Sequence, residues 1–195
     1  RISGKPILYH IMKHYANYGI KDFIIAAGYK KNIIIEFFKK NKISSWNVKV
    51  IDTGINTMTG GRLKRLEKYL KKETFMLTYG DGLSNVNLKK LLKFHKKYKK
   101  ISTLTSARPP ARFGAIKING NQVTYFKEKS KLDEGWINGG FFVFEPEIFK
   151  FINGDRTYLE REPLQNISKR GQLYAYKHYG FWQCMDTMRD KELLE

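Results

Sequence analysis

The strongest constraint on the fold is a repeated alternation between short apolar runs and longer amphipathic segments. Four apolar runs are typical of buried strands: Asp22–Tyr29, Trp46–Thr53, Phe75–Tyr79 and Ile101–Ala107. Segments with apolar residues at helical spacing accompany them, at Pro6–Gly19, Asn32–Lys40, Gly60–Leu70 and Asn87–Tyr98. Because such alternation is typical of βαβ units, we predict an α/β fold. The sheet is expected to be Rossmann-like, mixed but mostly parallel, and flanked by helices.

The pattern changes after Ala107, where shorter and more β-rich segments follow. Asn119–Gly120–Asn121 lies between two short alternating runs and predicts a β-hairpin. A strand and turn over Trp136–Phe149, a helix around Pro163 and a further strand are expected next. A closing helix begins with Asp186 or Thr187 as its cap. At 195 residues, the chain is expected to form a single domain with a small β-rich second part.

The charge balance is strongly basic, with 37 Lys and Arg against 18 Asp and Glu, a net charge of +19. In Leu88–Lys100 the leucines share one helical face and the lysines spread over the rest, which is typical of a solvated helix surface. A positive field also favours a small phosphorylated substrate. Nucleic-acid binding is disfavoured, because neither zinc-finger spacing nor an aromatic RNA-binding signature is present.

Features of the whole sequence also indicate the cellular compartment of the protein. No apolar stretch is long enough to span a membrane, and the opening residues do not read as a signal peptide. The single cysteine, Cys184, cannot form a disulfide within the chain. These features predict a cytoplasmic protein without a membrane partner.

One aspartate lies at the end of a predicted strand. Asp81 lies between two glycines, directly after the apolar run Phe75–Tyr79 and before a helical segment. On the tripeptide alone a simple turn is favoured, because Gly and Asp are common turn residues. The carboxyl end of a strand in an α/β sheet is also where ligands bind. A ligand-binding role therefore stands beside the turn as an alternative.

Several other element ends are rich in glycine, in charge or in both. They are Thr57–Arg65, Arg112–Ile116, Phe126–Lys129, Ile137–Val143 and Gly180–Thr187. Taken singly, each is explained by a helix start, a turn, a surface charge or a helix cap. Taken together, they indicate a site for phosphates, with backbone N–H groups, cations and two carboxylates for a divalent metal.

These stretches, in this order, resemble the sugar-1-phosphate nucleotidyltransferase family over essentially the whole chain. The motifs are SGKPILYHIM, MTGGRLKR, TYGDG, RFGA, INGGFF, EPL and GFWQ with MDT. MTGGRLKR together with GFWQ and MDT resembles the cytidylyl branch in particular. The resemblance implies that a cytidylyl group passes from CTP to α-D-glucose 1-phosphate by in-line displacement, giving CDP-glucose for polysaccharide biosynthesis. It also implies a homo-oligomer, with nucleotide bound by residues 1–107 and sugar phosphate by residues 108–195.

The resemblance implies roles for individual residues. Asp81 and Asp186 would hold Mg²⁺, and Lys129 would hold the sugar phosphate, so that these three are the expected catalytic residues. The positions that match nucleotide-contacting residues are Thr57, Arg62 and Gly80. The positions that match sugar-contacting residues are Glu128, Asn138 and Gly139.

The chain departs from the family pattern in three places. The family's opening loop, G-G-x-G-T-R-L, does not occur before Arg1, and the segment at Lys42–Ser45 is shorter than usual. Ser130 replaces the proline that usually follows the motif lysine. Because the other site residues are intact, we expect the loop to belong to the full gene product. A thymidylyl- or uridylyltransferase and a non-catalytic sugar-nucleotide-binding homologue remain the alternatives.

Overall fold

The computed structural model describes residues 1–109, 115–127 and 135–195. The first half contains α1 (Ile7–Asn17), β1 (Asp22–Ala27), α2 (Lys31–Lys40), β2 (Asn47–Asp52), α3 (Thr59–Arg65), α4 (Glu67–Leu70), β3 (Phe75–Thr78), β4 (Gly82–Ser84) and α5 (Leu88–Tyr98). The second half contains β5 (Ser102–Ala107), β6 (Ala115–Asn119), β7 (Gln122–Lys127), β8 (Ile137–Phe144), the 3₁₀ helix η1 (Pro146–Phe151), α6 (Glu162–Lys169), β9 (Leu173–Lys177), β10 (Trp182–Cys184) and α7 (Met188–Leu194). The α/β class with mixed sheets is confirmed.

The central sheet has the strand order β3-β8-β5-β9. β5 and β9 are parallel, whereas β8 runs antiparallel to both β3 and β5. Three of the four strands, β3, β5 and β9, therefore run in the same direction and β8 runs against them, which confirms the expected mixed sheet. The antiparallel β5–β8 pair is consistent with its connection, because the described elements between these two strands are β6 and β7, which form a hairpin, whereas parallel neighbours need a crossover connection. The parallel pair that was expected early in the chain is present. β1 and β2 pair in parallel, with Asp22 opposite Asn47 at one end and Ala27 opposite Asp52 at the other.

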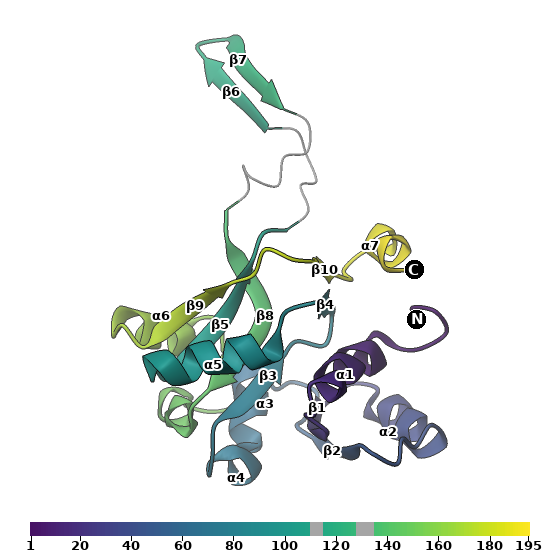
Figure 1. Cartoon of the computed structure of the whole chain (residues 1–195). Helices are drawn as coiled ribbons and strands as arrows, with labels where there is room; N and C mark the ends of the chain where they lie inside the picture. The colour runs from purple at the N-terminus through teal and green to yellow at the C-terminus, as the bar shows by residue number, and fades with distance from the viewer. Residues whose placement is uncertain (110–114, 128–134) are drawn as a thin grey trace.

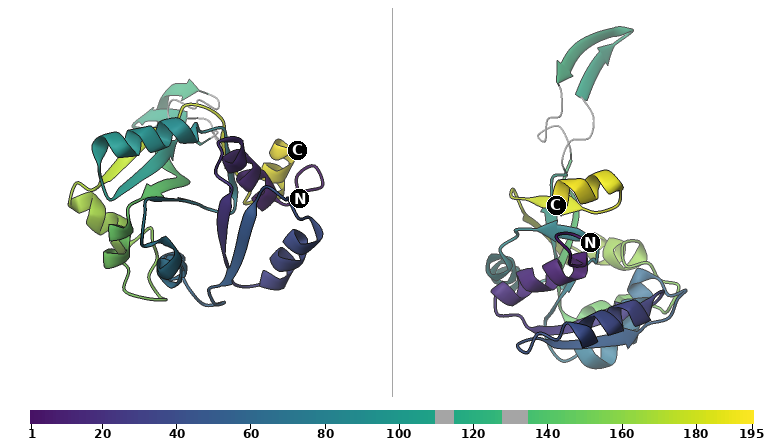
Figure 2. Two further views of the ribbon diagram at one scale, coloured as in Figure 1. Left: turned by 60° about the horizontal axis from the view of Figure 1, so that its bottom comes forward. Right: turned by 90° about the vertical axis from the view of Figure 1, so that its right-hand side faces the viewer.

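Apolar clusters cover both faces of the central sheet. Phe142 and Phe144 of β8 pack with η1 and α6 residues such as Ile148 and Ile167. Phe141 and Val143, which point the other way, pack with residues of α1 and α5. β8 is thus buried on both faces, as a strand between two helical layers must be. Figures 1 and 2 show α5 and α6 beside this sheet, with β1, β2 and α2 on the other side of the molecule.

Three local features differ from the sequence expectation. The helix expected over Gly60–Leu70 is divided into α3 and α4 at Leu66. The loop after Asp81 forms a short strand, β4, which pairs with β10 in an antiparallel ladder. Of the two candidate caps for the closing helix, Thr187 takes the role, in a capping box with Asp190.

The expected hairpin is present as β6 and β7, and it projects away from the body of the molecule (Figure 1). Three of its apolar side chains face solvent: Ile118 is 60% exposed, Val123 53% and Phe126 66%. A two-stranded hairpin without a packed face has little stability of its own. More than half of each of these three side chains therefore remains open to solvent.

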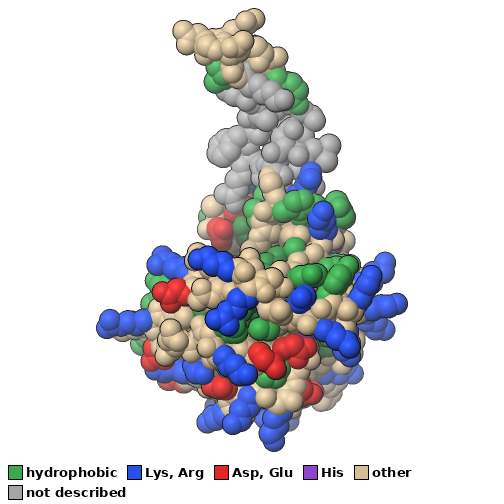
Figure 3. Space-filling model, turned by 90° about the vertical axis from the view of Figure 1, so that its left-hand side faces the viewer, with side chains coloured by type: hydrophobic (Ala, Val, Ile, Leu, Met, Phe, Trp, Pro, Cys, Tyr) green, Lys and Arg blue, Asp and Glu red, His purple; other side chains and the backbone are tan. Residues whose placement is uncertain are grey.

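The surface carries the basic excess over a wide area. Figure 3 shows Lys and Arg side chains distributed over one whole face of the body, with Asp and Glu between them, rather than gathered in one patch. Among the described residues, no helix is long and apolar enough to cross a bilayer.

Candidate active site

The β4–β10 ladder brings two aspartates together. Gly82 pairs with Cys184, and the backbone N–H of Met185 donates to the carbonyl of Asp81 at 2.8 Å. Asp81 lies just before β4, and Asp186 lies two residues after β10. Both side chains are solvent-exposed. The two carboxylates predicted to act together are thus placed at one point by strands that sequence analysis did not predict.

The two carboxylates influence one another. Although Asp81 is open to solvent on one side, the protein around it limits its hydration, and this partial burial raises the pKa of its carboxyl. The like charge of Asp186 raises that pKa further. A divalent cation would relieve this repulsion, and hard carboxylate oxygens are the ligands that Mg²⁺ prefers.

The composition of the site suits a metal that is shared with a substrate. Among the described residues there is no cluster of three or more His, Cys, Asp or Glu side chains that could enclose an ion. Two carboxylates leave most of an octahedral coordination sphere to water and to phosphate oxygens. The pair therefore fits an ion that arrives with a phosphorylated ligand.

Asp186 is held by a buried neighbour, Asp190, which is 4% exposed. Asp190 Oδ2 accepts from the backbone N–H of Asp186 at 3.2 Å and from that of Thr187 at 3.0 Å. Its Oδ1 accepts from Gln183 Nε2 at 3.0 Å. The capping box of α7 thus also fixes the backbone from which Asp186 projects.

A small hollow of about 30 Å³ lies beside Asp81. It is lined by Thr78, Tyr79, Asp81, Gly82, Asn138, Gly139, Gly140, Phe141 and Trp182. Three predicted site residues, Asp81, Asn138 and Gly139, therefore lie together. Gly80, also predicted, is exposed, and a Cβ atom added to it would meet nothing within 4 Å. The backbone at Gly80 is consequently open to close approach by a ligand.

Packing gives Gly139 a second reason to be glycine. A Cβ atom there would lie 2.9 Å from the carbonyl oxygen of Thr105. Its own carbonyl accepts from Trp182 Nε1 at 2.8 Å. Trp182 is thereby turned into the hollow, where it lines the wall. Close approach of Gly139 to a sugar remains a prediction.

Tyr79 is a site residue that sequence analysis missed. Its hydroxyl donates to Glu160 and lies 3.4 Å from Asn138 Nδ2. Burial raises the pKa of this phenol above its usual value, and the negative charges of Glu160 and Asp81 act in the same direction. The hydroxyl therefore keeps its proton and serves as a donor. Its position inside TYGDG was the available signal, whereas nothing in the sequence indicated Glu160 as its partner.

The predicted nucleotide contacts Thr57 and Arg62 lie near the carboxyl ends of β1 and β2. Arg62 Nη1 donates to Thr53 Oγ1 at 2.8 Å, and its Nη2 donates to the carbonyl of Ile55 at 3.3 Å. A Cβ atom on Gly28 would lie 2.5 Å from this guanidinium. The arginine is thus held in a defined position at the strand ends, where α/β sheets bind ligands.

The glycines at the start of α3 serve packing rather than exposure. Gly60 and Gly61 are buried, and the N–H of Gly61 donates to the carbonyl of Thr157 at 3.1 Å. A Cβ atom on Gly61 would lie 2.4 Å from the Asp155 carbonyl oxygen. The suggestion that this stretch offers free backbone N–H groups to phosphate is therefore wrong at Gly61. The backbone of residues 155–157 occupies that space.

Two predicted residues cannot be placed. Glu128 and Lys129 lie outside the described residues.

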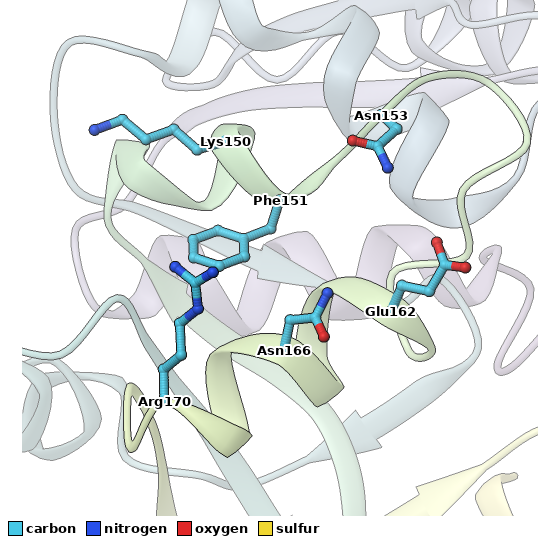
Figure 4. Close-up of a pocket in the computed structure, with 6 residues that line it drawn as sticks. All are labelled: Lys150, Phe151, Asn153, Glu162, Asn166 and Arg170. Atoms are coloured by element: carbon cyan, nitrogen blue, oxygen red, sulfur yellow. The ribbon is translucent and has the colours of Figure 1, made fainter.

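A larger depression of about 530 Å³ lies between η1 and α6 (Figure 4). The described residues that line it are Lys150, Phe151, Asn153, Glu162, Asn166 and Arg170. None of these is a predicted site residue, and Arg170 is stacked over Phe151 at 5.1 Å from the ring centroid. The predicted site residues lie instead beside the smaller hollow, which Asp81, Asn138 and Gly139 line.

Taken together, these features define an α/β protein with a mixed sheet and a pair of exposed carboxylates at its strand ends. The profile of the nucleotidyl transferase family matches residues 1–186. The chain belongs to this family. It is 46% identical over 216 residues to the glucose-1-phosphate cytidylyltransferases of Salmonella typhimurium and Salmonella typhi, covering 100% of this chain and 84% of each relative.

Solved structures agree on the fold. HddC from Yersinia pseudotuberculosis superposes with a TM-score of 0.78 at 23% sequence identity, covering 100% of this chain and 86% of that one. At this identity the similarity establishes the fold alone.

Proposed function

We propose that this protein transfers the cytidylyl group of CTP to the phosphate of α-D-glucose 1-phosphate, giving CDP-glucose and pyrophosphate. The observation that supports the proposal most is the 46% identity to relatives of that name over the whole chain. The pairing of Asp81 with Asp186 is consistent with it, because the proposed reaction needs a metal between strand ends and phosphates.

The chemistry needs positioning and charge neutralisation more than covalent help from the protein. An oxygen of the sugar phosphate attacks the α-phosphorus of CTP, and pyrophosphate leaves on the opposite side. Asp81 and Asp186 would hold Mg²⁺, which when bound supplies positive charge against the negative charge that develops on the phosphates. Gly80, with open space beside its backbone, admits the nucleotide next to these carboxylates.

The remaining proposed contacts are divided between a nucleotide side and a hexose side of the site. Thr57 and Arg62, at the strand ends of β1 and β2, are proposed to contact the nucleotide. On the opposite side, Asn138 and Gly139 in the small hollow are proposed to contact the hexose. Glu128 would bind sugar hydroxyls, and Lys129 would bind the sugar phosphate. Residues 1–107 and 108–195 thus divide the two substrates between them. Both substrates are intracellular metabolites, which supports a cytoplasmic reaction.

The decisive experiment is pyrophosphate release by the full gene product with Mg²⁺ and glucose 1-phosphate. CTP, UTP, dTTP, ATP and GTP are offered in turn at equal concentration. Release chiefly with CTP supports the proposal, whereas release chiefly with UTP or dTTP assigns the protein to another branch. A folded protein that releases pyrophosphate with none of them would be a binding homologue. Omission of Mg²⁺, with excess chelator, should abolish the release.

We also propose that the protein forms a homo-oligomer through the β6–β7 hairpin. The hairpin presents Ile118, Val123 and Phe126 to solvent, each more than half exposed. A projecting hairpin gains stability by packing its apolar side chains against a third element. A second copy of this chain is the occupant that would supply the same element in return, as two-fold interfaces require.

A further inference from the structure

One carboxylate in the candidate site joins segments that are far apart in the chain. Glu160 Oε1 accepts a hydrogen bond from the Tyr79 hydroxyl at 2.5 Å. Its Oε2 accepts one from the Thr59 hydroxyl at 2.7 Å. Each oxygen of Glu160 is therefore occupied by a different hydroxyl, one from the loop after β3 and one from the first residue of α3.

The connection extends at both ends. Asn138 Nδ2 donates to the Tyr79 hydroxyl at 3.4 Å, and the N–H of Leu159 donates to Thr59 Oγ1 at 2.9 Å. The series Asn138–Tyr79–Glu160–Thr59 thus runs from the proposed hexose side to helix α3. That helix carries Arg62, on the proposed nucleotide side.

The Tyr79 side chain is itself held in place. The backbone N–H of Tyr79 donates to the carbonyl of Gly140 at 3.0 Å. A Cβ atom on Gly140, which has φ of +73°, would lie 2.8 Å from the tyrosine ring. The ring therefore packs directly against the Gly140 backbone, and its hydroxyl is directed at Glu160. The Tyr79 hydroxyl thereby lies between Glu160 and Asn138, in hydrogen-bond contact with both.

A purely stabilising role is a weak explanation for Glu160. Its side chain is solvent-exposed, and exposed hydrogen bonds contribute only about 1 kcal/mol or less to the free energy of unfolding. A carboxylate beside a site for two anionic substrates also repels them. Its benefit must therefore lie in the geometry that it imposes on its two donors.

We propose that Glu160 is a positioning residue that couples the hexose and nucleotide sides of the site, acting through Tyr79 on one side and Thr59 on the other. This inference rests on the proposed function. Removing either arm should misplace one substrate only, because each hydroxyl reaches only one side. Removing Glu160 should affect both substrates.

The test is steady-state kinetics with four variants and two matched controls. Tyr79→Phe removes only the hexose arm, and we expect the KM for glucose 1-phosphate to rise about 2–10-fold, the equivalent of one hydrogen bond, with the KM for CTP unchanged. Thr59→Val should do the reverse, and Thr59→Ser should restore wild-type values because it keeps the hydroxyl. Tyr158→Phe, at a tyrosine that is 40% exposed, should change neither KM.

Combining substitutions completes the test, because it shows whether Glu160 and Tyr79 act through the same hydrogen bond. Glu160→Ala should raise both KM values, and Tyr79→Phe added to it should cause no further rise for glucose 1-phosphate, because the arm is already broken. Additive effects, an equal change in both KM values in Tyr79→Phe, or altered thermal stability with unchanged kinetics would overturn the inference.

Assaying the wild-type protein in parallel distinguishes failure of the Glu160 proposal from failure of the proposed function. An active wild type with indifferent variants refutes only the role of Glu160. If another nucleotide is the substrate, the same variants are read with that nucleotide. A wild type without turnover would overturn both proposals, since no reaction would remain for Glu160 to serve.

Discussion

At the scale of single residues, the pair of aspartates allows the most direct test of the proposed metal site. Asp81→Asn and Asp186→Asn should each lower kcat/KM by about 100-fold or more, because several kcal/mol of charge stabilisation by the metal is lost. The measurement is pyrophosphate release at saturating Mg²⁺. Asp22→Asn is the matched control, because this exposed carboxylate accepts from Asn47 Nδ2 at the opposite end of β1. Wild-type turnover in either site variant would refute the metal assignment.

The same substitutions should not harm the fold. Asp186 raises the pKa of the Asp81 carboxyl by like-charge repulsion, on top of partial burial. Neutralising Asp81 therefore removes an unfavourable interaction in the metal-free protein. We expect Asp81→Asn to have an unchanged or higher melting temperature than wild type without added metal, by calorimetry. A marked fall would show that the carboxylate is needed for folding, and the kinetic result would then lose its meaning.

Sequence motifs singled out Asp81 and Asp186, and the structure brings the two residues together, whereas their role in binding a metal stays a prediction. Asp81 carries flanking glycines and Asp186 belongs to the stretch that holds GFWQ and MDT, so each was visible in the printed chain. The pairing of Tyr79 with Glu160 was not, because tertiary packing chooses a partner that is 81 residues away. Asp190 was missed for a similar reason, since its capping role depends on a helix start that could be placed only to within a residue.

At the scale of elements, α3, which carries Arg62 on the proposed nucleotide side, packs closely against residues 155–157. A Cβ atom on Gly61 would lie 2.4 Å from the Asp155 carbonyl oxygen and 2.6 Å from its Cα. Because these are backbone atoms, Gly61→Ala should destabilise the protein by about 1–3 kcal/mol, partly offset by the better helix propensity of alanine. Gly135→Ala, where a Cβ atom would meet nothing within 4 Å, is the control. Chemical denaturation of both variants measures the difference, and equal stabilities would refute the packing argument.

A second element-level prediction concerns α1 and the segment after β4. His14 Nε2 lies 2.9 Å from the carbonyl of Val86, and burial lowers the pKa of this imidazole, helped by repulsion from His178. The rings of Tyr18 and Phe141 also face it. Below the usual histidine pKa of about 6.5, the unfolded chain takes up a proton that the folded chain resists. The free energy of unfolding should therefore fall as the pH drops from about 7 towards 5.

The readout is the slope of unfolding free energy against pH. His14→Asn should be less stable near pH 7 but should show a shallower fall towards pH 5, because the contribution of this group is gone. His10→Asn, which loses a similar bond to the Ile2 carbonyl on the same helix, controls for the lost hydrogen bond. An unchanged slope in His14→Asn would exclude this histidine as the source.

Helices and strands were predicted well where a periodic pattern of apolar residues extends over many residues. They were predicted less well where the connection between two strands decides their relative direction. The lysine-rich α5 and the parallel β1–β2 pair followed from their patterns. The direction of β8 did not, because its run of buried residues is the same for parallel and antiparallel neighbours. β4 and β10 were missed because each has three residues, too few for a period to register.

At the scale of the whole molecule, the projecting hairpin sets the expected assembly. Val123→Asp combined with Phe126→Asp places two charges where side chains are 53% and 66% exposed. Such charges cost little in a lone subunit but must be desolvated in an interface. We expect the double variant to sediment as a monomer, with unchanged circular dichroism, while wild type sediments as an oligomer.

The matched control is Ile33→Asp, on α2, where the side chain is 61% exposed. It adds the same kind of charge at a similarly exposed apolar position in the body, and it should leave the oligomer intact. A wild-type monomer, or a double variant with wild-type mass, would refute the hairpin interface. Loss of assembly in Ile33→Asp alone would move the interface to α2 instead. Because the proposed site lies within one chain, the monomeric variant should retain turnover in the pyrophosphate assay if the hairpin serves assembly only.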